Sequence, residues 1–218
     1  MGWLFEKRAY HSEKNGLITC RRIFGRWKIL VKGAEQSSTY VTNMWRNAIA
    51  RTPFRTPVSR ILILGLGGGG GSLSVSRQRF PNALITVVEW DPVMVKIWKD
   101  LNFFQADERV TIMLGDASEV VPNLTKTFDL ILCDLFFGWD IQGFVAEKPF
   151  LLALRRVLSR NGLLVMNFFQ QKKTAAAVSA CFLPEAAWRF QYNALARFTQ
   201  KEDSSYSHAQ MPPHGDVR

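Results

Sequence analysis

Five short apolar segments, most of them followed at once by glycine or an acidic residue, dominate the middle of the chain. They are segments 61–64, 84–88, 110–114, 128–133 and 163–169. None alternates strictly between apolar and polar residues, and unbroken apolar strands are typical of sheets that are covered on both faces. Segments of helical composition lie between them, at 92–101 and 148–159. This alternation predicts an α/β fold with a doubly wound, mostly parallel sheet.

The N-terminal part follows a different pattern. Residues 1–14 show no regular period, whereas 17–20 and 27–31 are β-like runs with a glycine-containing connection between them. Two such runs predict a β-hairpin. A helix is predicted over 39–50, because prolines follow it and end it. We therefore expect a small N-terminal β-hairpin appendage without a core of its own.

Beyond the apolar segments the pattern becomes weaker. We expect a helix over 173–183 and one strand over 188–198, and we interpret Asn161-Gly162 as the C-cap of the helix before it. The expected organisation is an appendage of hairpin and helix in 1–57, an α/β domain in 58–200 and a disordered tail in 201–218.

The composition is that of a globular chain. With 218 residues, 47% hydrophobic and 21% charged, disorder of the whole chain is excluded. No apolar run reaches the roughly 18 residues of a spanning helix, and Glu6 interrupts the start where a signal peptide needs its apolar core. The cysteines, Cys20, Cys133 and Cys181, are widely spaced, so we expect reduced thiols, no metal site and a cytoplasmic location.

Positive charge gathers at one end of the chain. The net charge is +10, and residues 1–60 hold 12 of the basic residues but only three acids. This excess fits a patch for nucleic acid or another polyanion, a solubilising face, or a basic flank beside an anionic cofactor or partner subunit. No zinc finger, RNP-like aromatic run or long basic helix accompanies it. We therefore do not favour nucleic acid as the partner.

A glycine-rich segment follows the first apolar strand. Gly65, Gly67 and Gly70 satisfy the pattern GxGxxG, although in a run of five glycines that match is easily met. Glycines after a strand let the backbone approach a ligand and direct the N–H groups of a helix N-terminus at it. A nucleotide-binding turn is the functional interpretation, and a flexible turn without ligand is the alternative.

Two acids at the ends of the next strands predict contacts to adenosine. Glu89 lies 24 residues after Gly65, where a carboxylate can accept hydrogen bonds from both ribose hydroxyls in NAD enzymes and in S-adenosylmethionine (SAM) enzymes. Asp116 and Ala117 follow the third strand, where Asp reaches the adenine amino group and Ala leaves room for the ring. This second pair favours SAM over NAD. The alternatives are an exposed acid at Glu89 and a helix N-cap at Asp116.

The fourth strand ends at Asp134, which we expect on the rim of the sheet beside the glycine turn. A carboxylate there could orient a nucleophilic amine and take its proton, and a loop-capping role is the alternative. Aromatic residues near it, Trp90, Phe136, Phe137 and Trp139, would line a pocket around adenine or a sulfonium, or belong to the core or a subunit interface.

The motifs together resemble a known family. ILILGLGGGGGSL, ITVVEWDPVMV, RVTIMLGDA, FDLILCDLFFG and GLLVMNFF, in this order, are similar to the bacterial spermidine-synthase-like branch of the class I SAM-binding fold. The resemblance covers about residues 12–170, including the appendage.

The resemblance implies a role for each matched residue. Gly65, Gly67 and Gly69 would face the amino acid or aminopropyl part of the nucleotide, and Gln36 would match a glutamine near it. Glu89 would hold the ribose, with Trp90 beside the adenine that Asp116 and Ala117 bind. Asp134 would match the first Asp of the family's DSSDP-type loop, which is implicated in activating the amine.

The chain also departs from the polyamine enzymes of that family. Gly68 replaces the Asp of their GGGDGG loop, 135–137 read Leu-Phe-Phe where they carry a second acid, and Val41–Met44 replace a His-Glu pair after the tyrosine matched by Tyr40. A polyamine needs acids along its groove, and most of these are missing.

The sequence therefore predicts a SAM-dependent transferase, with methyl transfer favoured over aminopropyl transfer. The co-substrate would be SAM or decarboxylated SAM, the acceptor an unidentified small molecule, and the assembly a homodimer. The alternatives are a polyamine aminopropyltransferase, a non-catalytic nucleotide-binding or assembly protein of the same fold, and an NAD(P) oxidoreductase.

Overall fold

The computed structural model describes residues 5–101, 103, 107–168 and 171–201. The tail predicted to be disordered lies outside the described residues from 202 onward. No helix of the described part is long and apolar enough to cross a membrane.

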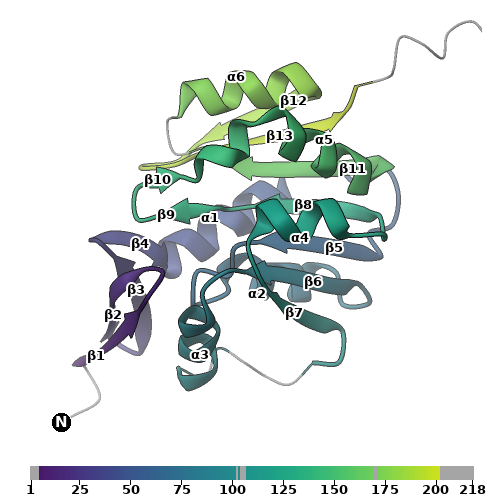
Figure 1. Ribbon diagram of the computed structural model, residues 1–218. Coiled ribbons are helices and arrows are strands. Elements are labelled where there is room, and N and C mark those ends of the chain that lie inside the picture. Colours follow the sequence, from purple (N-terminus) through teal and green to yellow (C-terminus); the bar gives the residue numbers. More distant parts are fainter. Residues whose placement is uncertain (1–4, 102, 104–106, 169–170, 202–218) are drawn as a thin grey trace, which may run out of the picture.

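A seven-stranded sheet forms the centre of the molecule, in the order β12-β13-β11-β8-β5-β6-β7 (Figure 1). Its strands are β5 (Arg60–Leu64), β6 (Leu84–Glu89), β7 (Val110–Leu114), β8 (Phe128–Cys133), β11 (Leu158–Asn167), β12 (Phe182–Arg189) and β13 (Ala194–Gln200). Strands β11, β8, β5, β6 and β7 run parallel, and β13 pairs antiparallel with both β11 and β12. Ile61 to Leu64 are fully buried in β5, as an unbroken apolar strand predicts. The predicted fold class is confirmed.

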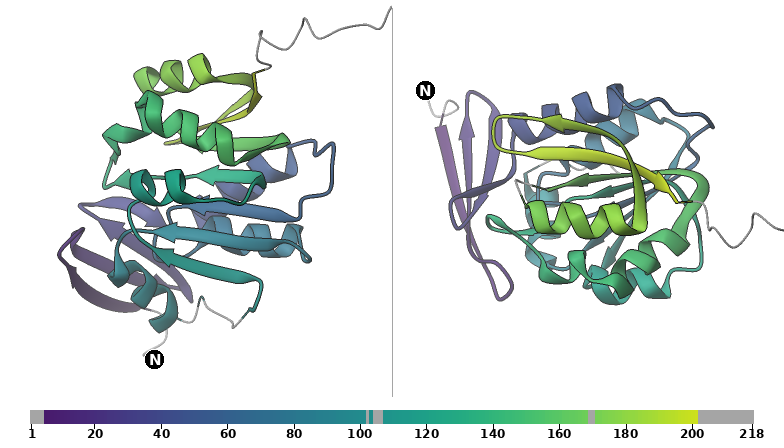
Figure 2. Two further views of the ribbon diagram at one scale, coloured as in Figure 1. Left: turned by 45° about the vertical axis from the view of Figure 1, so that its right-hand side comes forward. Right: turned by 90° about the horizontal axis from the view of Figure 1, so that it is seen from above.

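Helices cover both faces of this sheet (Figure 2). One face packs against α1 (Thr39–Ala50), α2 (Gly71–Arg79) and α3 (Pro92–Asp100), and the other against α4 (Ala117–Asn123), α5 (Lys148–Val157) and α6 (Lys172–Cys181). After β8 the chain forms the two-stranded β9 (Phe136–Phe137) and β10 (Asp140–Ile141), then the short 3₁₀ helix η1 (Gly143–Ala146).

The N-terminal appendage is a four-stranded antiparallel sheet of β1 (Phe5–Ser12), β2 (Gly16–Ile23), β3 (Arg26–Val31) and β4 (Ala34–Ser37). Its inner face contributes Ile18, Cys20, Ile29 and Val31 to a buried cluster with Met94, Ile97 and Leu101 in and just after α3. The appendage therefore shares its core with the α/β domain, which holds it over the glycine turn.

The irregular segment expected for 1–14 is wrong over β1. The inward positions of this strand include the half-buried Glu6 and Tyr10 and the exposed Arg8, which are polar, so the strand shows no apolar alternation. Its pairing with β2 continues over the whole strand, from Phe5 opposite Ile23 to Ser12 opposite Gly16.

Two predictions for the C-terminal part are also wrong. The single strand expected over 188–198 is a hairpin, whose turn falls between β12 and β13 and contains no glycine or proline to mark it. Gly162 is not a helix cap, because α5 ends at Val157 and β11 begins at Leu158. A Cβ at Gly162 would lie 2.9 Å from the Phe128 carbonyl oxygen, so close strand contact requires this glycine.

Candidate active site

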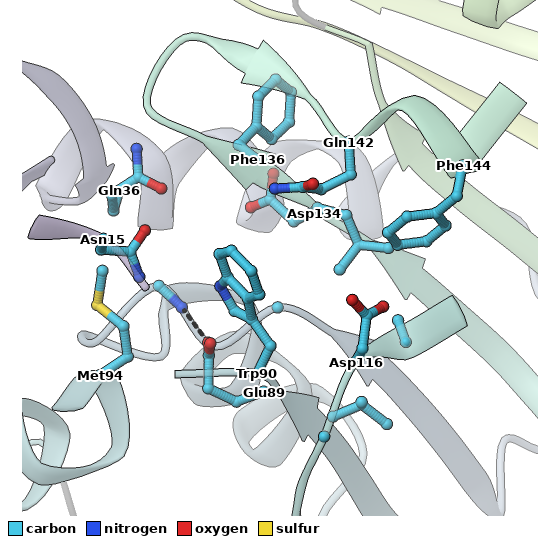
Figure 3. A pocket seen from close by; sticks show the side chains of 16 residues that line it. Asn15, Gln36, Glu89, Trp90, Met94, Asp116, Asp134, Phe136, Gln142 and Phe144 are labelled. Atoms are coloured by element: carbon cyan, nitrogen blue, oxygen red, sulfur yellow. Dashed lines mark hydrogen bonds between the residues drawn. The ribbon is translucent and has the colours of Figure 1, made fainter. Parts of the chain in front are cut away.

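A cavity opens at the carboxyl ends of β5, β6, β7 and β8, where an open α/β sheet binds its ligands (Figure 3). It brings together most of the residues singled out in the sequence. These are Gln36, Gly65, Gly67, Glu89, Trp90, Asp116, Ala117 and Asp134. Asn15, Met94, Gln142 and Phe144, which sequence reasoning missed, complete its wall beside Leu135 and Phe136.

Glu89 is hydrogen-bonded to the backbone of the glycine turn. Its carboxylate accepts hydrogen bonds from the backbone N–H groups of Leu66 at 2.9 Å, Gly67 at 3.4 Å and Asp91 at 3.0 Å. Burial raises the pKa of the Glu89 carboxyl above its usual value, and these three donors offset only part of that rise. A carboxylate offers about four lone-pair positions, so Glu89 keeps capacity for a donor from a ligand in the cavity.

Asp116 caps a helix and also faces the cavity. Its Oδ1 accepts from the N–H of Ser118 at 2.8 Å and from the Ser118 hydroxyl at 2.7 Å, which caps α4. The side chain also points into the cavity, next to the buried and small Ala117 (Figure 3). Trp90 lines the same space and meets the ring of Phe137 edge-on at 6.2 Å.

Gly67 and Gly69 have no room for a side chain, because strand β4 packs closely against the turn. A Cβ at Gly67 would lie 2.6 Å from the carbonyl oxygen of Gln36, and a Cβ at Gly69 would collide with the Ser37 side chain. Both contacts come from β4, so the appendage itself needs a turn without side chains. Gly69 does not line the cavity, unlike Gly65 and Gly67.

Asp134 follows β8 and is held by two side-chain donors. Trp45 of α1 donates its indole N–H to Oδ2 at 3.0 Å, and Asn167 at the end of β11 donates to Oδ1 at 2.9 Å. Burial raises the pKa of the Asp134 carboxyl above its usual value, and these two donors offset only part of that rise. Neither partner was singled out in the sequence. Asn167 ends an apolar strand as Asp134 does, and that position was the signal available for it.

A second cavity of about 430 Å³ adjoins the first, and the two share Gln36, Gly67, Asp134 and Phe136. Its further wall comes from α1, the β3–β4 segment, the loop between β9 and β10, the end of β11 and the β12–β13 turn. The residues there include Leu30, Tyr40, Met44, Trp139, Asn167, Tyr192 and Asn193. We call this space the acceptor cavity. Tyr192 and Asn193 lie in a turn that the sequence did not reveal.

Little free charge faces the acceptor cavity. Among the described residues that line it, the acids are Asp134 and Glu35 and the base is Lys28. Lys28 and Glu35 form an ion pair with each other. Asp140, the other acid of the loop after β8, is exposed and lines neither cavity.

The known proteins that this chain resembles include both aminopropyltransferases and methyltransferases. A family model described as "Spermine/spermidine synthase domain" matches residues 43–180. The chain is 31% identical over 140 residues to a polyamine aminopropyltransferase of Vibrio vulnificus (strain CMCP6), a match that covers 63% of this chain and 46% of that protein. It is 33% identical over 121 residues to an eEF1A lysine and N-terminal methyltransferase of Danio rerio, covering 51% of this chain and 17% of that protein.

A solved structure of spermidine synthase in complex with the transition-state analogue AdoDATO has a TM-score of 0.71 at 16% identity, covering 88% of this chain and 71% of that chain. This likeness shows the shared class I SAM-dependent methyltransferase fold. The chain spans less than half the length of either curated relative.

Proposed function

The chain belongs to the spermine/spermidine synthase domain family, and on that premise we propose that it transfers a methyl group from SAM to a small acceptor with one nucleophilic nitrogen. The observation that carries the proposal is the position of Asp134. It lines both cavities, so a nitrogen that donates a hydrogen bond to Asp134 lies beside the space for the donor's reactive carbon.

The residues of the first cavity fit an adenosyl sulfonium. The carboxylates of Glu89 and Asp116 suit the ribose hydroxyls and the adenine amino group, and the small Ala117 leaves room for a flat ring. Trp90 adds an aromatic face, which attracts a sulfonium as well as a base. The donor supplies an alkyl carbon that is already activated by positively charged sulfur.

Asp134 orients the acceptor for an in-line displacement. The nitrogen lone pair forms the new N–C bond while the C–S bond breaks, and the electron pair of that bond stays on sulfur as a neutral thioether. The proton of the nitrogen passes to Asp134 or to water. Positioning supplies most of the rate enhancement, because the leaving group needs no further activation.

The charges of the acceptor cavity favour methyl transfer over aminopropyl transfer. Asp134 is the acid of the described lining that no cation neutralises, since Glu35 is paired with Lys28. An acid in place of Gly68 would be buried against apolar atoms, because a Cβ there lies 3.0 Å from Met94 Sδ and 3.2 Å from Ile29 Cδ1. Aminopropyl transfer remains the second candidate, favoured by the aminopropyltransferase relative.

Calorimetry with SAM, decarboxylated SAM, methylthioadenosine and NADH tests the donor. Tightest binding of SAM supports the proposal, tightest binding of decarboxylated SAM supports aminopropyl transfer, and binding of NADH alone overturns both.

Incubation of the protein with SAM and a panel of amines, with the products identified by mass spectrometry, then tests the transfer. Asp134→Asn should lower turnover by about 10²- to 10⁴-fold with little change in SAM affinity. Asp140→Asn, an exposed acid of the same loop, is the matched control.

A further inference from the structure

A chain of hydrogen bonds connects the β12–β13 turn to Asp134. The backbone N–H of Tyr192 donates to the Tyr40 hydroxyl at 3.0 Å, and that hydroxyl donates to Asn193 Oδ1 at 3.1 Å. Asn193 Nδ2 donates to Asn167 Oδ1 at 3.1 Å, and Asn167 Nδ2 donates to Asp134 Oδ1 at 2.9 Å. Four polar side chains, from α1, the β12–β13 turn, β11 and the residue after β8, therefore form one continuous network.

The bonds of this network all run in one direction, toward the carboxylate of Asp134, which can only accept. The Tyr40 oxygen accepts from the backbone N–H of Tyr192, and its single proton is directed to Asn193 Oδ1. With its oxygen occupied in this way, the Asn193 amide presents its NH₂ group to Asn167. The Asn167 amide then presents its own NH₂ group to Asp134, which can only accept.

We propose that this network is a positioning relay that keeps Asp134 as a carboxylate, and that Tyr40 and Asn193 are positioning residues for the transfer. The role of Tyr40 and Asn193 in transfer rests on the proposed function, whereas their effect on the protonation state of Asp134 does not. The relay opposes burial, which favours the neutral acid. A neutral Asp134 could not take a proton from the acceptor nitrogen.

Other titratable groups face the same space. Across the acceptor cavity lie the Lys28–Glu35 pair and the phenols of Tyr40 and Tyr192, across the first cavity lie Glu89 and Asp116, and the buried Cys133 thiol precedes Asp134 in β8. Tyr40→Phe adds no charge to this set, so it isolates the effect of the relay, whereas Asn193→Asp breaks the relay and also adds a carboxylate near Asp134.

Two substitutions break the relay at different points. Tyr40→Phe removes the donor to Asn193 while keeping the ring that meets Tyr192 edge-on at 5.7 Å. Asn193→Asp removes the donor to Asn167, so the Asn167 amide turns its oxygen toward Asp134 and its donor is lost there. Tyr192→Phe is the matched control, because it keeps the backbone N–H and removes a hydroxyl that accepts from Gln191.

The indole N–H of Trp45 reports on Asp134 without any turnover, since it donates to Oδ2. Its ¹H–¹⁵N resonance, identified among the seven tryptophans by its loss in Trp45→Phe, should titrate with the protonation of Asp134. We expect Asn193→Asp to raise the proton affinity of Asp134 at least about tenfold and Tyr40→Phe to raise it several-fold. Tyr192→Phe should leave the titration midpoint unchanged.

Equal midpoints in the wild type and in folded Tyr40→Phe would overturn the relay, as would an equal shift in Tyr192→Phe. Tyr40→Phe keeps the test decisive if Asn193→Asp does not fold. Where turnover is measurable, the acid limb of its pH profile should move upward with the NMR midpoint while KM for SAM stays constant. Shifted midpoints without methyl transfer would retain the relay and reject the proposed function.

Discussion

Glu89 connects the glycine turn to the space expected for ribose. We predict that Glu89→Ala weakens SAM binding by about 1.5–3 kcal/mol, or roughly 10- to 150-fold in Kd, through the loss of charge-assisted hydrogen bonds. Calorimetry measures the change, and circular dichroism verifies that the variant is folded. Unchanged affinity in a folded variant would remove Glu89 from the site.

The same substitution also removes the acceptor for Leu66 and Gly67, so its effect on the turn must be separated from its effect on ribose. A 2′,3′-dideoxy analogue of the ligand completes a double-mutant cycle with Glu89→Ala. If Glu89 contacts ribose, deleting the hydroxyls weakens binding to the wild type and has little further effect on the variant. Additive losses would assign Glu89 to the turn alone.

Residues at strand ends were the ones that the sequence could reveal. Glu89, Asp116 and Asp134 each follow an apolar strand, and parallel strands bring their carboxyl ends to one edge of the sheet. Trp45 and Asn193 escaped prediction because their contacts to this edge join segments far apart in the chain. No local pattern encodes the distance of 89 residues between Trp45 and its acceptor Asp134.

At the scale of elements, buried Asp91 holds the appendage to α3. Its carboxylate accepts from the Ser12 hydroxyl and the Asn15 amide, each at 2.5 Å, and from the N–H of Val93 at 2.8 Å, where it caps the helix. We predict that Asp91→Ala lowers the free energy of unfolding by about 2–4 kcal/mol, since it leaves buried donors unpaired. Urea denaturation measures this loss.

Asp100→Ala is the control for that experiment. Asp100 ends the same helix, but its carboxylate is partly exposed and paired with Lys96, so its loss should matter much less. Asp100 also contacts Arg8 and Tyr10 of β1, so a similar loss in both variants would mean that the buried hydrogen bonds of Asp91 add nothing beyond what an exposed contact to the appendage contributes. In Asp91→Ala we also expect earlier proteolysis within the β1–β2 hairpin.

The elements were predictable where burial on both faces leaves an unbroken apolar run, as in β5 and β8. Prediction failed at the sheet edges. β1 and β12 are edge strands with mostly exposed residues, so neither carries a regular apolar period. The turn between β12 and β13 lacks glycine and proline, and the two strands therefore read as one.

At the scale of the molecule, the basic excess of the N-terminal part lies partly on the outer face of the β1–β4 sheet. Lys7 lies opposite Arg21, and Arg21 lies opposite Lys28, so three cations lie side by side across three strands, of which Lys28 is paired with Glu35. Exposed Leu17 and Ile23 lie on the same face of β2 as Arg21. The outer face therefore combines apolar side chains with positive charge.

The homodimer expected from the sequence stays a prediction. If the outer face forms the dimer interface, the stability of the dimer should depend on the salt concentration. Two-fold pairing through the face would bring its row of cations close to the same row of the second copy. We therefore predict that light scattering gives a mass of twice 24.9 kDa and that salt strengthens the dimer by screening this repulsion. A monomer at every protein and salt concentration would contradict it.

The acids of the acceptor cavity carry the proposed preference for methyl transfer over aminopropyl transfer. Putrescine carries two ammonium groups, and aminopropyl transfer needs one of them deprotonated while a separate acid holds the other. Asp134 can serve one group, but Glu35 is already paired with Lys28, and Asp140 lies outside the cavity. The lost contact to the other, desolvated ammonium costs roughly 1.5–3 kcal/mol, which lowers turnover about 10- to 150-fold.

We therefore predict that the protein does not make spermidine at an appreciable rate. The assay supplies radiolabelled decarboxylated SAM and putrescine, beside an authentic aminopropyltransferase under the same conditions. Lys28→Ala is the informative variant, because it releases Glu35 as a second acid and should raise any residual spermidine formation. Turnover by the unmodified protein comparable to that of the authentic enzyme would reject methyl transfer and establish that Asp134 with the paired Glu35 suffices for a polyamine.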